Sequence, residues 1–112
     1  MYVNDKMVLQ LVALLKKFGI KKVVVSPGSR HNKLINSLET DGSFKLYLVV
    51  DERSAAFFAL GLIQECGEPV AVTCSSGTAC MNYGSAIVEA FYQRLPLIVL
   101  SSDRVPELLN QC

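Results

Sequence analysis

Two adjacent carboxylates, Asp51 and Glu52, stand between an apolar run at residues 46–50 and a segment at 53–65 whose small and apolar residues recur at helical spacing. They are therefore expected where a strand feeds a helix, which is the edge at which open α/β sheets hold their ligands. A carboxylate at that edge can meet a ligand. It can also cap the helix or place a negative charge in its first turn. Taken alone, the pair is more typical of capping.

Three further polar loops follow apolar runs, at residues 26–30, 75–78 and 101–104. If these runs are parallel strands, all four loops lie at one edge of the sheet. The first two combine glycine with hydroxyl residues ahead of a helix, where free N–H groups can hold an anion. Neither matches the glycine fingerprint of a dinucleotide site or of a P-loop. Together the loops favour a ligand-binding edge without specifying a nucleotide.

Arginines lie in or next to three of these loops, at Arg30, Arg53 and Arg104. Arginine offers a planar, permanently charged fork that suits a carboxylate or a phosphate. The alternative is structural: serine and threonine cap helices, glycine turns the chain, and arginine pairs with a nearby aspartate. Arg53 is expected to pair locally and to support the loop that carries Glu52.

The order of elements predicts an α/β fold. Short apolar runs without alternation are typical of buried parallel strands, and here they alternate with segments that carry a helical apolar stripe. This pattern predicts a parallel sheet with right-handed crossovers and helices on both faces. In the last helix, Met81, Tyr83 and Phe91 are expected in the core or at an interface. The predicted strands are 22–25, 46–50, 70–74 and 97–100, and the predicted helices are 5–18, about 30–38, 53–65 and 78–92.

The composition excludes several classes of protein. A chain of 112 residues is long enough for one small domain, and 51% apolar residues with a net charge of +1 argue against a disordered chain, an acidic tail or a nucleic-acid groove. No apolar run approaches the roughly 20 residues of a membrane span. The first residues lack the apolar stretch of a signal peptide, so a cytoplasmic location is expected.

The cysteine and histidine contents limit the possible chemistry. The four cysteines, at 66, 74, 80 and 112, form no CxxC pair and no metal-ligand spacing. Cys74 and Cys80 lie among apolar or small residues, where free cysteine is usually a small core residue. His31 is the single histidine, which argues against a histidine-based triad or a multi-histidine metal site.

The C-terminal part of the sequence looks incomplete for this fold. After the fourth predicted strand the chain passes Pro106 and reaches Cys112 without a segment that predicts a covering helix. A sheet left uncovered would expose apolar surface. Residues 1–112 are therefore expected to form one truncated domain.

The segments around the four loops carry a family resemblance. They are VVVSPGSR, VVDERSAAFFALG, VAVTCSSGTACMNYGSAIVEA and LPLIVLSSDRVPEL. In this order they resemble the N-terminal, pyrimidine-binding domain of thiamine-diphosphate-dependent enzymes. More narrowly, they are similar to the 2-succinyl-5-enolpyruvyl-6-hydroxy-3-cyclohexene-1-carboxylate synthase family of menaquinone biosynthesis. The resemblance spans nearly the whole chain and implies a flavodoxin- or Rossmann-like domain.

The resemblance implies a catalytic role for Glu52. The matching glutamate hydrogen-bonds a ring nitrogen of the cofactor's aminopyrimidine and promotes the imino tautomer, which removes the thiazolium C2 proton to give the ylid. Burial raises the pKa of a glutamate and so suits it to share a proton with that nitrogen. The strand at 46–50 and Ala55, Ala56 and Phe57 are expected to supply the burial.

The resemblance also implies substrates and binding residues. Family members decarboxylate 2-oxoglutarate and add the succinyl-semialdehyde unit to isochorismate. Ser29, Arg30 and Arg104 match positions that meet these anionic substrates, for which arginine is chemically suited. Pro27 and Thr78 match positions near the pyrimidine. For these two residues, the structural roles of turn former and helix N-cap are equally open.

The rest of the active site is expected outside this chain. Family members bury the cofactor between this domain and a pyrophosphate domain of another subunit, which holds Mg²⁺ through a Gly-Asp-Gly motif that this sequence lacks. The chain alone is thus expected to hold no metal and to be inactive, and the full-length transferase is expected to be a homodimer or homotetramer. The alternative is a stand-alone α/β regulatory domain whose loops hold an anionic or phosphorylated ligand without catalysis.

Overall fold

The apolar runs form one parallel sheet in residues 5–28 and 32–102, the part of the chain that the computed structural model describes. The strand order is β2-β1-β3-β4, so β1 and β3 are central. β3 is buried at every position, as its unbroken run of apolar and small residues requires. The predicted parallel α/β fold is therefore confirmed. The strands are β1 (Lys22–Val25), β2 (Lys45–Leu48), β3 (Val70–Cys74) and β4 (Leu97–Ser101).

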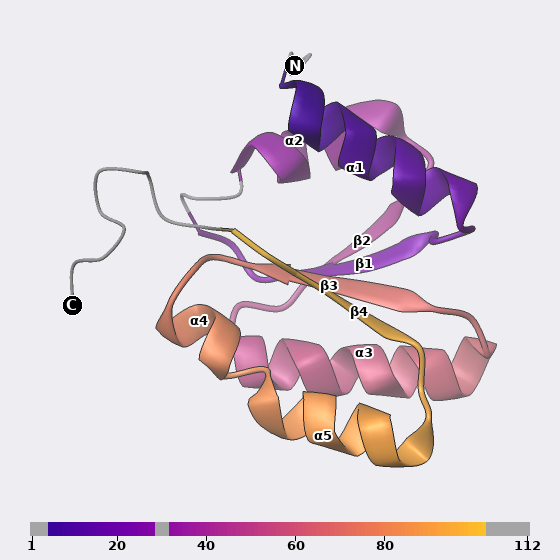
Figure 1. The fold of residues 1–112 in the computed structure, drawn as a ribbon, viewed down its shortest axis with the longest axis vertical. Helices are drawn as coiled ribbons and strands as arrows, with labels where there is room; N and C mark the ends of the chain where they lie inside the picture. Colours follow the sequence, from indigo (N-terminus) through magenta and orange to yellow (C-terminus); the bar gives the residue numbers. More distant parts are fainter. Residues whose placement is uncertain (1–4, 29–31, 103–112) are drawn as a thin grey trace.

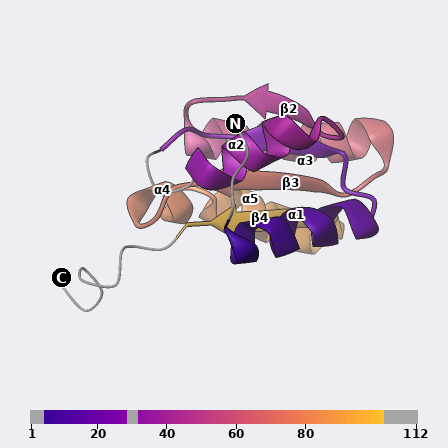
Figure 2. The same ribbon diagram turned by 90° about the horizontal axis from the view of Figure 1, so that it is seen from above.

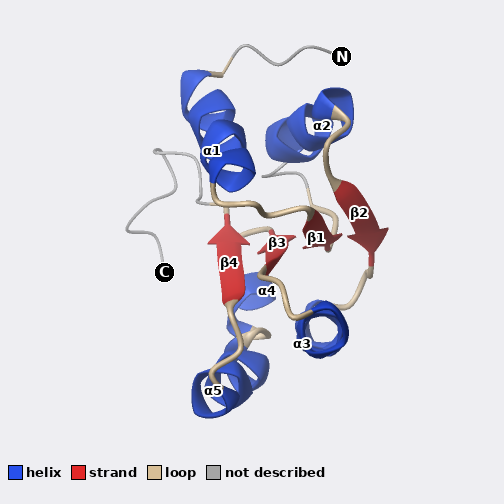
Figure 3. Cartoon of the chain, turned by 90° about the vertical axis from the view of Figure 1, so that its right-hand side faces the viewer, coloured by secondary structure: helices blue, strands red, loops and turns tan. Residues whose placement is uncertain are grey.

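Helices cover both faces of the sheet, as predicted. α1 and α2 lie on one face, and α3, α4 and α5 lie on the other (Figures 1 and 3). Figure 2 shows α1 and α2 in front of the sheet. The helices are α1 (Lys6–Lys17), α2 (Asn32–Asp41), α3 (Glu52–Cys66), α4 (Thr78–Met81) and α5 (Gly84–Gln93).

The central strands divide their side chains between two apolar cores. Val24 packs into the core beneath α3 and α5, whereas Val23 and Val25 pack into the core beneath α1 and α2. This division follows from the alternation of side chains along a strand. On α3, small residues at the sheet-facing positions let the helix approach the strands closely, and three of them are fully buried: Ala55, Ala56 and Ala59.

The ends of α3 are fixed by sequence. Asp51 is the N-cap, and its carboxylate accepts a hydrogen bond from the Ser54 amide. At the other end Gly67 adopts a left-handed conformation with φ of 70°, and its N–H donates to the Ile63 carbonyl at 2.7 Å. α3 thus extends from Glu52 to Cys66, one residue beyond the predicted helix at each end.

The predicted extent of the second strand was wrong at its C-terminal end. β2 ends at Leu48, not at Val50. β2 is an edge strand that pairs only with β1, and the last paired residue of β1, Val25, lies opposite Leu48. The Val49 amide still donates to the Val25 carbonyl at 3.0 Å, but Val50 is 70% exposed. The chain therefore leaves the sheet two residues before Asp51.

The predicted single helix at 78–92 is also wrong, because two helices occupy this segment. α4 ends at Met81 and α5 begins at Gly84. Between them, the Asn82 side chain donates to the Thr78 carbonyl at 2.8 Å, and the Tyr83 amide donates to the Cys80 carbonyl three residues back. A side chain that binds a helical carbonyl competes with the regular helical pattern, and this break places Tyr83 at the start of α5.

The second helix ends later than predicted. α2 continues to Asp41 instead of ending near Leu38, and Gly42, with φ of 79°, follows it in the left-handed conformation. The helix end is tied to α1 by an ion pair of 3.0 Å between Lys16 and Asp41. Within residues 5–28 and 32–102, no helix is long and apolar enough to cross a membrane.

Candidate functional site

The C-terminal edge of the sheet brings the polar loops together. Beyond the strands, the Ser26 amide donates to the Thr73 carbonyl at 3.0 Å, and the Ser102 amide donates to the Cys74 carbonyl at 3.2 Å. The Ser26 hydroxyl donates to the Val49 carbonyl at 2.7 Å. Backbone and side-chain bonds thus tie the segment that follows β1 to the one that follows β2, and tie the segments that follow β1 and β4 to the end of β3. This edge is where an open α/β sheet holds a ligand.

The two carboxylates at this edge have different environments. The Asp51 carboxylate accepts a hydrogen bond of 2.8 Å from the Ser54 amide, which lowers the pKa of Asp51, and the charge of Arg53 lowers it further. Glu52 is the first residue of α3 and is partly buried. Its carboxylate makes no hydrogen bond or ion pair with any residue in 5–28 or 32–102. The capping role therefore belongs to Asp51.

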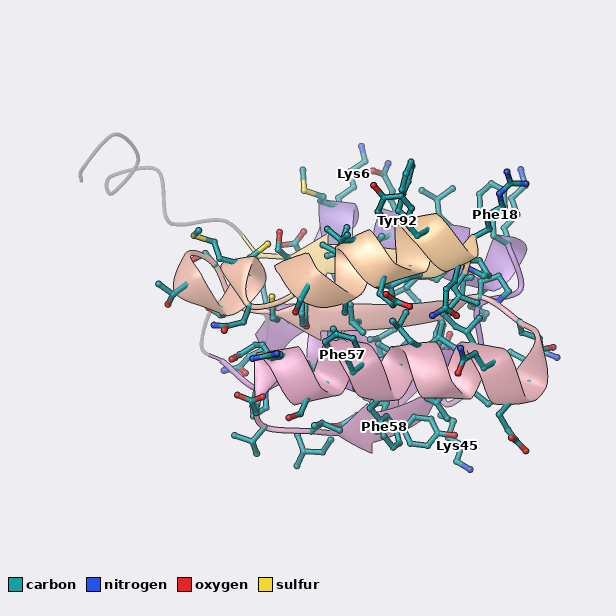
Figure 4. The ribbon with its side chains drawn as sticks, turned by 90° about the horizontal axis from the view of Figure 1, so that it is seen from below. Lys6, Phe18, Lys45, Phe57, Phe58 and Tyr92 are labelled. Carbon is teal, nitrogen blue, oxygen red and sulfur yellow. The ribbon has the colours of Figure 1, made fainter. Side chains whose placement is uncertain are left out.

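The surroundings of Glu52 are apolar on one side. Ala55 and Ala56, two of the residues expected to supply burial, are fully buried themselves, whereas the third, Phe57, is 40% exposed. Figure 4 shows Phe57 on the outer side of α3, away from the sheet. The reason is helical geometry, because Ala55, Ala56 and Ala59 occupy the sheet-facing stripe and Phe57 lies outside it. Burial is the main cause that raises the pKa of Cys74 and of Tyr83, and the charge of Glu52 adds to both, so these three residues lie in one region of the protein.

An open hollow of about 800 Å³ lies beside the first turn of α3. Glu52 is absent from its described lining, although both of its neighbours in the sequence contribute to it. The walls combine a carboxylate, a guanidinium, a hydroxyl, an amide and an aromatic ring. The lining residues are Asp51, Arg53, Ser54, Phe57 and Asn82. The hollow is thus polar with one aromatic wall, and the residues that directly precede and follow Glu52 in the sequence contribute to it.

Pro27 and Thr78, predicted near the pyrimidine, both lie at this edge and are exposed. Pro27 follows Ser26 after the end of β1. Thr78 is the first residue of α4, and the N-cap is Gly77, with φ of 70° and no side-chain cap. The predicted capping alternative for Thr78 is therefore wrong, because the glycine occupies that position. The Thr78 carbonyl accepts from the Asn82 side chain instead.

Three of the predicted site residues, Ser29, Arg30 and Arg104, lie outside the described residues. Arg53 is exposed. It makes no ion pair with a carboxylate of the described segments, although its charge acts on the neighbouring Asp51. The predicted local ion pair of Arg53 is therefore wrong for the described residues, and the effect that is seen there is the influence of its charge on Asp51.

Behind the edge lies a buried polar group that the sequence did not single out for function. Tyr83 is 0% exposed, which confirms its predicted place in the core, whereas Met81 and Phe91 are largely exposed. The Tyr83 hydroxyl completes no hydrogen bond within the described part of the chain. Burial raises the pKa of Tyr83, the Cys74 thiol raises it further, and the Ser26 hydroxyl lowers it. Helical spacing in the sequence predicted the burial of this tyrosine, but nothing in the sequence pointed to its hydroxyl.

The cysteines of the described residues are free thiols. Cys74 is fully buried, which confirms its assignment to the core, and Cys66 and Cys80 are partly buried. Burial raises the pKa of the Cys74 thiol to about 11, although the Tyr83 hydroxyl acts to lower it. Among the residues in 5–28 and 32–102, no three histidine, cysteine, aspartate or glutamate side chains gather as a metal site.

Comparison with known protein families gives a match over most of the chain. Residues 6–110 match the family described as thiamine pyrophosphate enzyme, N-terminal TPP binding domain. A protein of Phocaeicola vulgatus named 2-succinyl-5-enolpyruvyl-6-hydroxy-3-cyclohexene-1-carboxylate synthase is 50% identical over 99% of this chain. A protein of Porphyromonas gingivalis with the same name is 46% identical over 98% of it. The chain covers 20% and 19% of these relatives, so it spans about a fifth of their length.

Solved structures share the fold. Benzoylformate decarboxylase from Polynucleobacter necessarius superimposes with a TM-score of 0.78 at 28% identity, over 91% of this chain and 19% of that protein. A putative thiamin diphosphate-dependent enzyme from Mycobacterium smegmatis gives a TM-score of 0.76 at 28% identity, over 87% of this chain and 18% of its own. The same arrangement of strands and helices is therefore found in much longer proteins.

Proposed function

This chain belongs to the thiamine pyrophosphate enzyme family, in which it matches the N-terminal cofactor-binding domain, and we propose that it is the pyrimidine-binding part of a 2-succinyl-5-enolpyruvyl-6-hydroxy-3-cyclohexene-1-carboxylate synthase. The proposal is supported by relatives of that name at about half identity over nearly the whole chain. These relatives are about five times longer than this chain, which favours an enzyme part over a stand-alone regulatory domain.

The proposed reaction is a carboligation in menaquinone biosynthesis. 2-Oxoglutarate loses carbon dioxide, and the remaining succinyl-semialdehyde unit is added to isochorismate, so the enzyme is a transferase. Thiamine diphosphate, when bound, supplies the carbon nucleophile and the electron sink for this chemistry. The protein's contribution is to bind and orient the cofactor and the substrates, and to move protons.

Glu52 is proposed to hold the proton at a ring nitrogen of the aminopyrimidine. This role is supported by the difference between the two adjacent carboxylates. Asp51 caps α3, whereas the Glu52 carboxylate has no hydrogen-bond or ion-pair partner in the described residues. A partly buried carboxylate at the C-terminal edge of a parallel sheet has the chemistry to accept and return a proton there. Its position in the first helical turn also stabilises its charge.

The described residues fit the pyrimidine end of the cofactor. Glu52 offers a carboxylate for a ring nitrogen, and its two neighbours in the sequence line a polar hollow with an aromatic wall. Pro27 and Thr78 are proposed to contact the ring, since both are exposed at the same edge. Mg²⁺ and the diphosphate are proposed to be held by a further domain of the full-length protein, with residues 1–112 as an incomplete N-terminal domain.

Substrate binding is proposed for Ser29, Arg30 and Arg104. Both substrates carry carboxylates, and a guanidinium can bind a carboxylate through two parallel hydrogen bonds. The full-length enzyme is proposed to act as a homodimer or homotetramer in the cytoplasm, with the cofactor between subunits. Residues 1–112 alone are proposed to be inactive, because half of the site would be missing.

An assay of the full-length protein tests the proposed function. The purified protein is given thiamine diphosphate, Mg²⁺, 2-oxoglutarate and isochorismate, and both carbon dioxide and the ligated product are measured. Product that requires all four components is the expected result. Failure to form the product under conditions where a relative of the same name is active would overturn the proposal. Residues 1–112, assayed in parallel, should release no carbon dioxide.

A further inference from the structure

Ser26 is a buried polar residue at the point where β1 ends, and it makes hydrogen bonds to two other segments. It is 0% exposed. Its amide donates to the Thr73 carbonyl of β3 at 3.0 Å, and its hydroxyl donates to the Val49 carbonyl, in the segment between β2 and α3, at 2.7 Å. Burial of a hydroxyl costs free energy unless the group is hydrogen-bonded. A serine directly after a strand of buried valines therefore points to a specific use of its hydroxyl.

Pro27 explains why a side chain makes this bond. β1 and β2 pair in parallel with Val25 opposite Leu48, so the continued register places Ser26 opposite Val49. In a parallel pair, a residue bonds to the two positions that flank the residue opposite it. The Val49 amide accordingly donates to the Val25 carbonyl at 3.0 Å, and the Val49 carbonyl would next accept from the amide of residue 27. That residue is a proline, which has no N–H, so the Ser26 hydroxyl takes the place of the missing donor.

The bond to Val49 fixes the chain close to Glu52. Two residues, Val50 and Asp51, separate Val49 from Glu52. Asp51 is held from the helix side, because its carboxylate accepts the capping bond of α3 at 2.8 Å. Val50, which is 70% exposed, thus lies between two fixed points. Without the Ser26 hydroxyl, the Val49 carbonyl would lose this donor, and the path of the chain into Glu52 would be less restricted.

We propose that Ser26 is a positioning residue for Glu52: its hydroxyl replaces the sheet bond that Pro27 cannot make, and so holds the segment at 49–51 that presents the carboxylate. The catalytic part of this inference rests on the proposed function, whereas the hydrogen-bonding part rests on the fold alone. Ser26 does not need to touch the cofactor or a substrate, because its effect passes through the Val49 carbonyl.

The first test needs no activity. In the full-length protein without cofactor, Ser26→Ala removes the hydroxyl and keeps a small side chain at the buried position. Amide hydrogen exchange of the peptide spanning residues 49–56, measured by mass spectrometry, should become several-fold faster. The matched control is Ser37→Ala on α2, which removes a buried hydroxyl that makes no hydrogen bond within residues 5–28 and 32–102, and which should leave this peptide unchanged. Unchanged exchange in Ser26→Ala, or an equal increase in both variants, would overturn the proposal.

A second variant restores the donor by another route. Pro27→Ala supplies the backbone N–H that the register directs to the Val49 carbonyl. Added to Ser26→Ala, it should bring the exchange of the 49–56 peptide back toward the wild-type rate. Exchange that remains as fast as in Ser26→Ala alone would show that this carbonyl does not control the segment, and would also overturn the proposal.

The third test asks whether holding this segment matters for catalysis. In the full-length enzyme, Ser26→Ala should lower kcat roughly tenfold and leave the KM for 2-oxoglutarate unchanged, because a small displacement of a reacting group slows catalysis. In a Glu52→Gln background, Ser26→Ala should have no further effect on kcat, since its influence passes through Glu52. Additive losses, or a raised KM with kcat unchanged, would overturn the positioning role. A wild-type protein without synthase activity would overturn the proposed function instead, and the exchange experiments would still decide whether Ser26 holds the segment.

Discussion

The Asp51 carboxylate accepts a 2.8 Å hydrogen bond from the Ser54 amide, so the cap of α3 is made one residue before Glu52. Two adjacent acidic residues thus have different roles, and substituting each of them in turn can distinguish these roles. A change at Asp51 should act on the stability of the helix end. A change at Glu52 should act on the chemistry of the site.

Glu52→Gln in the full-length enzyme should lower kcat by roughly 10²-fold or more, because the amide cannot exchange a proton with the pyrimidine nitrogen. Glutamine has nearly the same shape, so the change in unfolding free energy should stay near 0.5 kcal/mol, the size of a helix-dipole contribution. Steady-state rates and thermal melts of the same variant measure both quantities. Near-normal proton exchange at C2 of the bound cofactor, followed by NMR, would contradict the catalytic role.

Asp51 should make stability depend on acid pH. Its pKa is lowered from 3.8 in the folded state by the hydrogen bonds from Ser54, so the folded state binds this proton less readily than the unfolded state. The stabilisation is therefore fully present above about pH 4 and is lost as the pH falls through the lowered folded value. Asp51→Asn should show a smaller drop in melting temperature between about pH 6 and pH 3 than wild type. Equal drops would show that the Ser54 bond does not influence this carboxyl.

The thiol of Cys74 should resist alkylation in the native protein. It is fully buried, and its pKa of about 11 leaves almost no thiolate at pH 8. Cys66, which is partly exposed, is the internal comparison. Mass spectrometry after a short treatment with iodoacetamide should find Cys66 modified well before Cys74, and denaturant should abolish the difference. Equal labelling of the two in the native protein would contradict the burial of Cys74.

Replacing by alanine a glycine within α3 and the glycine that follows α3 should change the stability of the protein in opposite directions. Gly67 has φ of 70°, a conformation that alanine adopts with strain, so Gly67→Ala should destabilise the protein by about 1 kcal/mol. Gly61 lies within α3, and no atom of residues 5–28 or 32–102 is near an added methyl group, so Gly61→Ala should stabilise by roughly 0.5–1 kcal/mol. Thermal unfolding of the two variants side by side checks the signs. Destabilisation by Gly61→Ala would point to an unseen contact on that face of the helix.

The sheet was predictable because each strand is marked by a short apolar run in the sequence. β3 coincides with the predicted strand at 70–74, and its apolar sequence carries that information by itself. The end of β2 was not predictable, because it depends on where its neighbour stops: Val49 and Val50 are as β-prone as Leu48, but β1 ends opposite Leu48. The break between α4 and α5 likewise depends on a side-chain bond from Asn82 that the apolar spacing does not reveal.

The location of the candidate site was predictable from the sequence, but the different roles of its residues were less so. The strand-to-helix position of Asp51 and Glu52 follows from the sequence, whereas the choice of Asp51 as the cap required the geometry of the Ser54 amide. Tyr83 was predictable as a core residue from its spacing. Its proximity to Ser26 arises from the parallel pairing of β1 with β3, which joins segments far apart in the chain, and no local pattern encodes it.

The strand order also bears on how the protein is made. β1 pairs with β3 at the centre of the sheet, for example through Val23 and Ala71. The whole of α2, β2 and α3 lies between these two strands in the sequence. A chain emerging from the ribosome can pair β1 with β2 early, but it cannot complete the centre of the sheet until Val70–Cys74 has appeared. Such distant pairing slows folding, because long loops must close first. During synthesis the sheet edge that carries Glu52 therefore stays incomplete until β3 has been made.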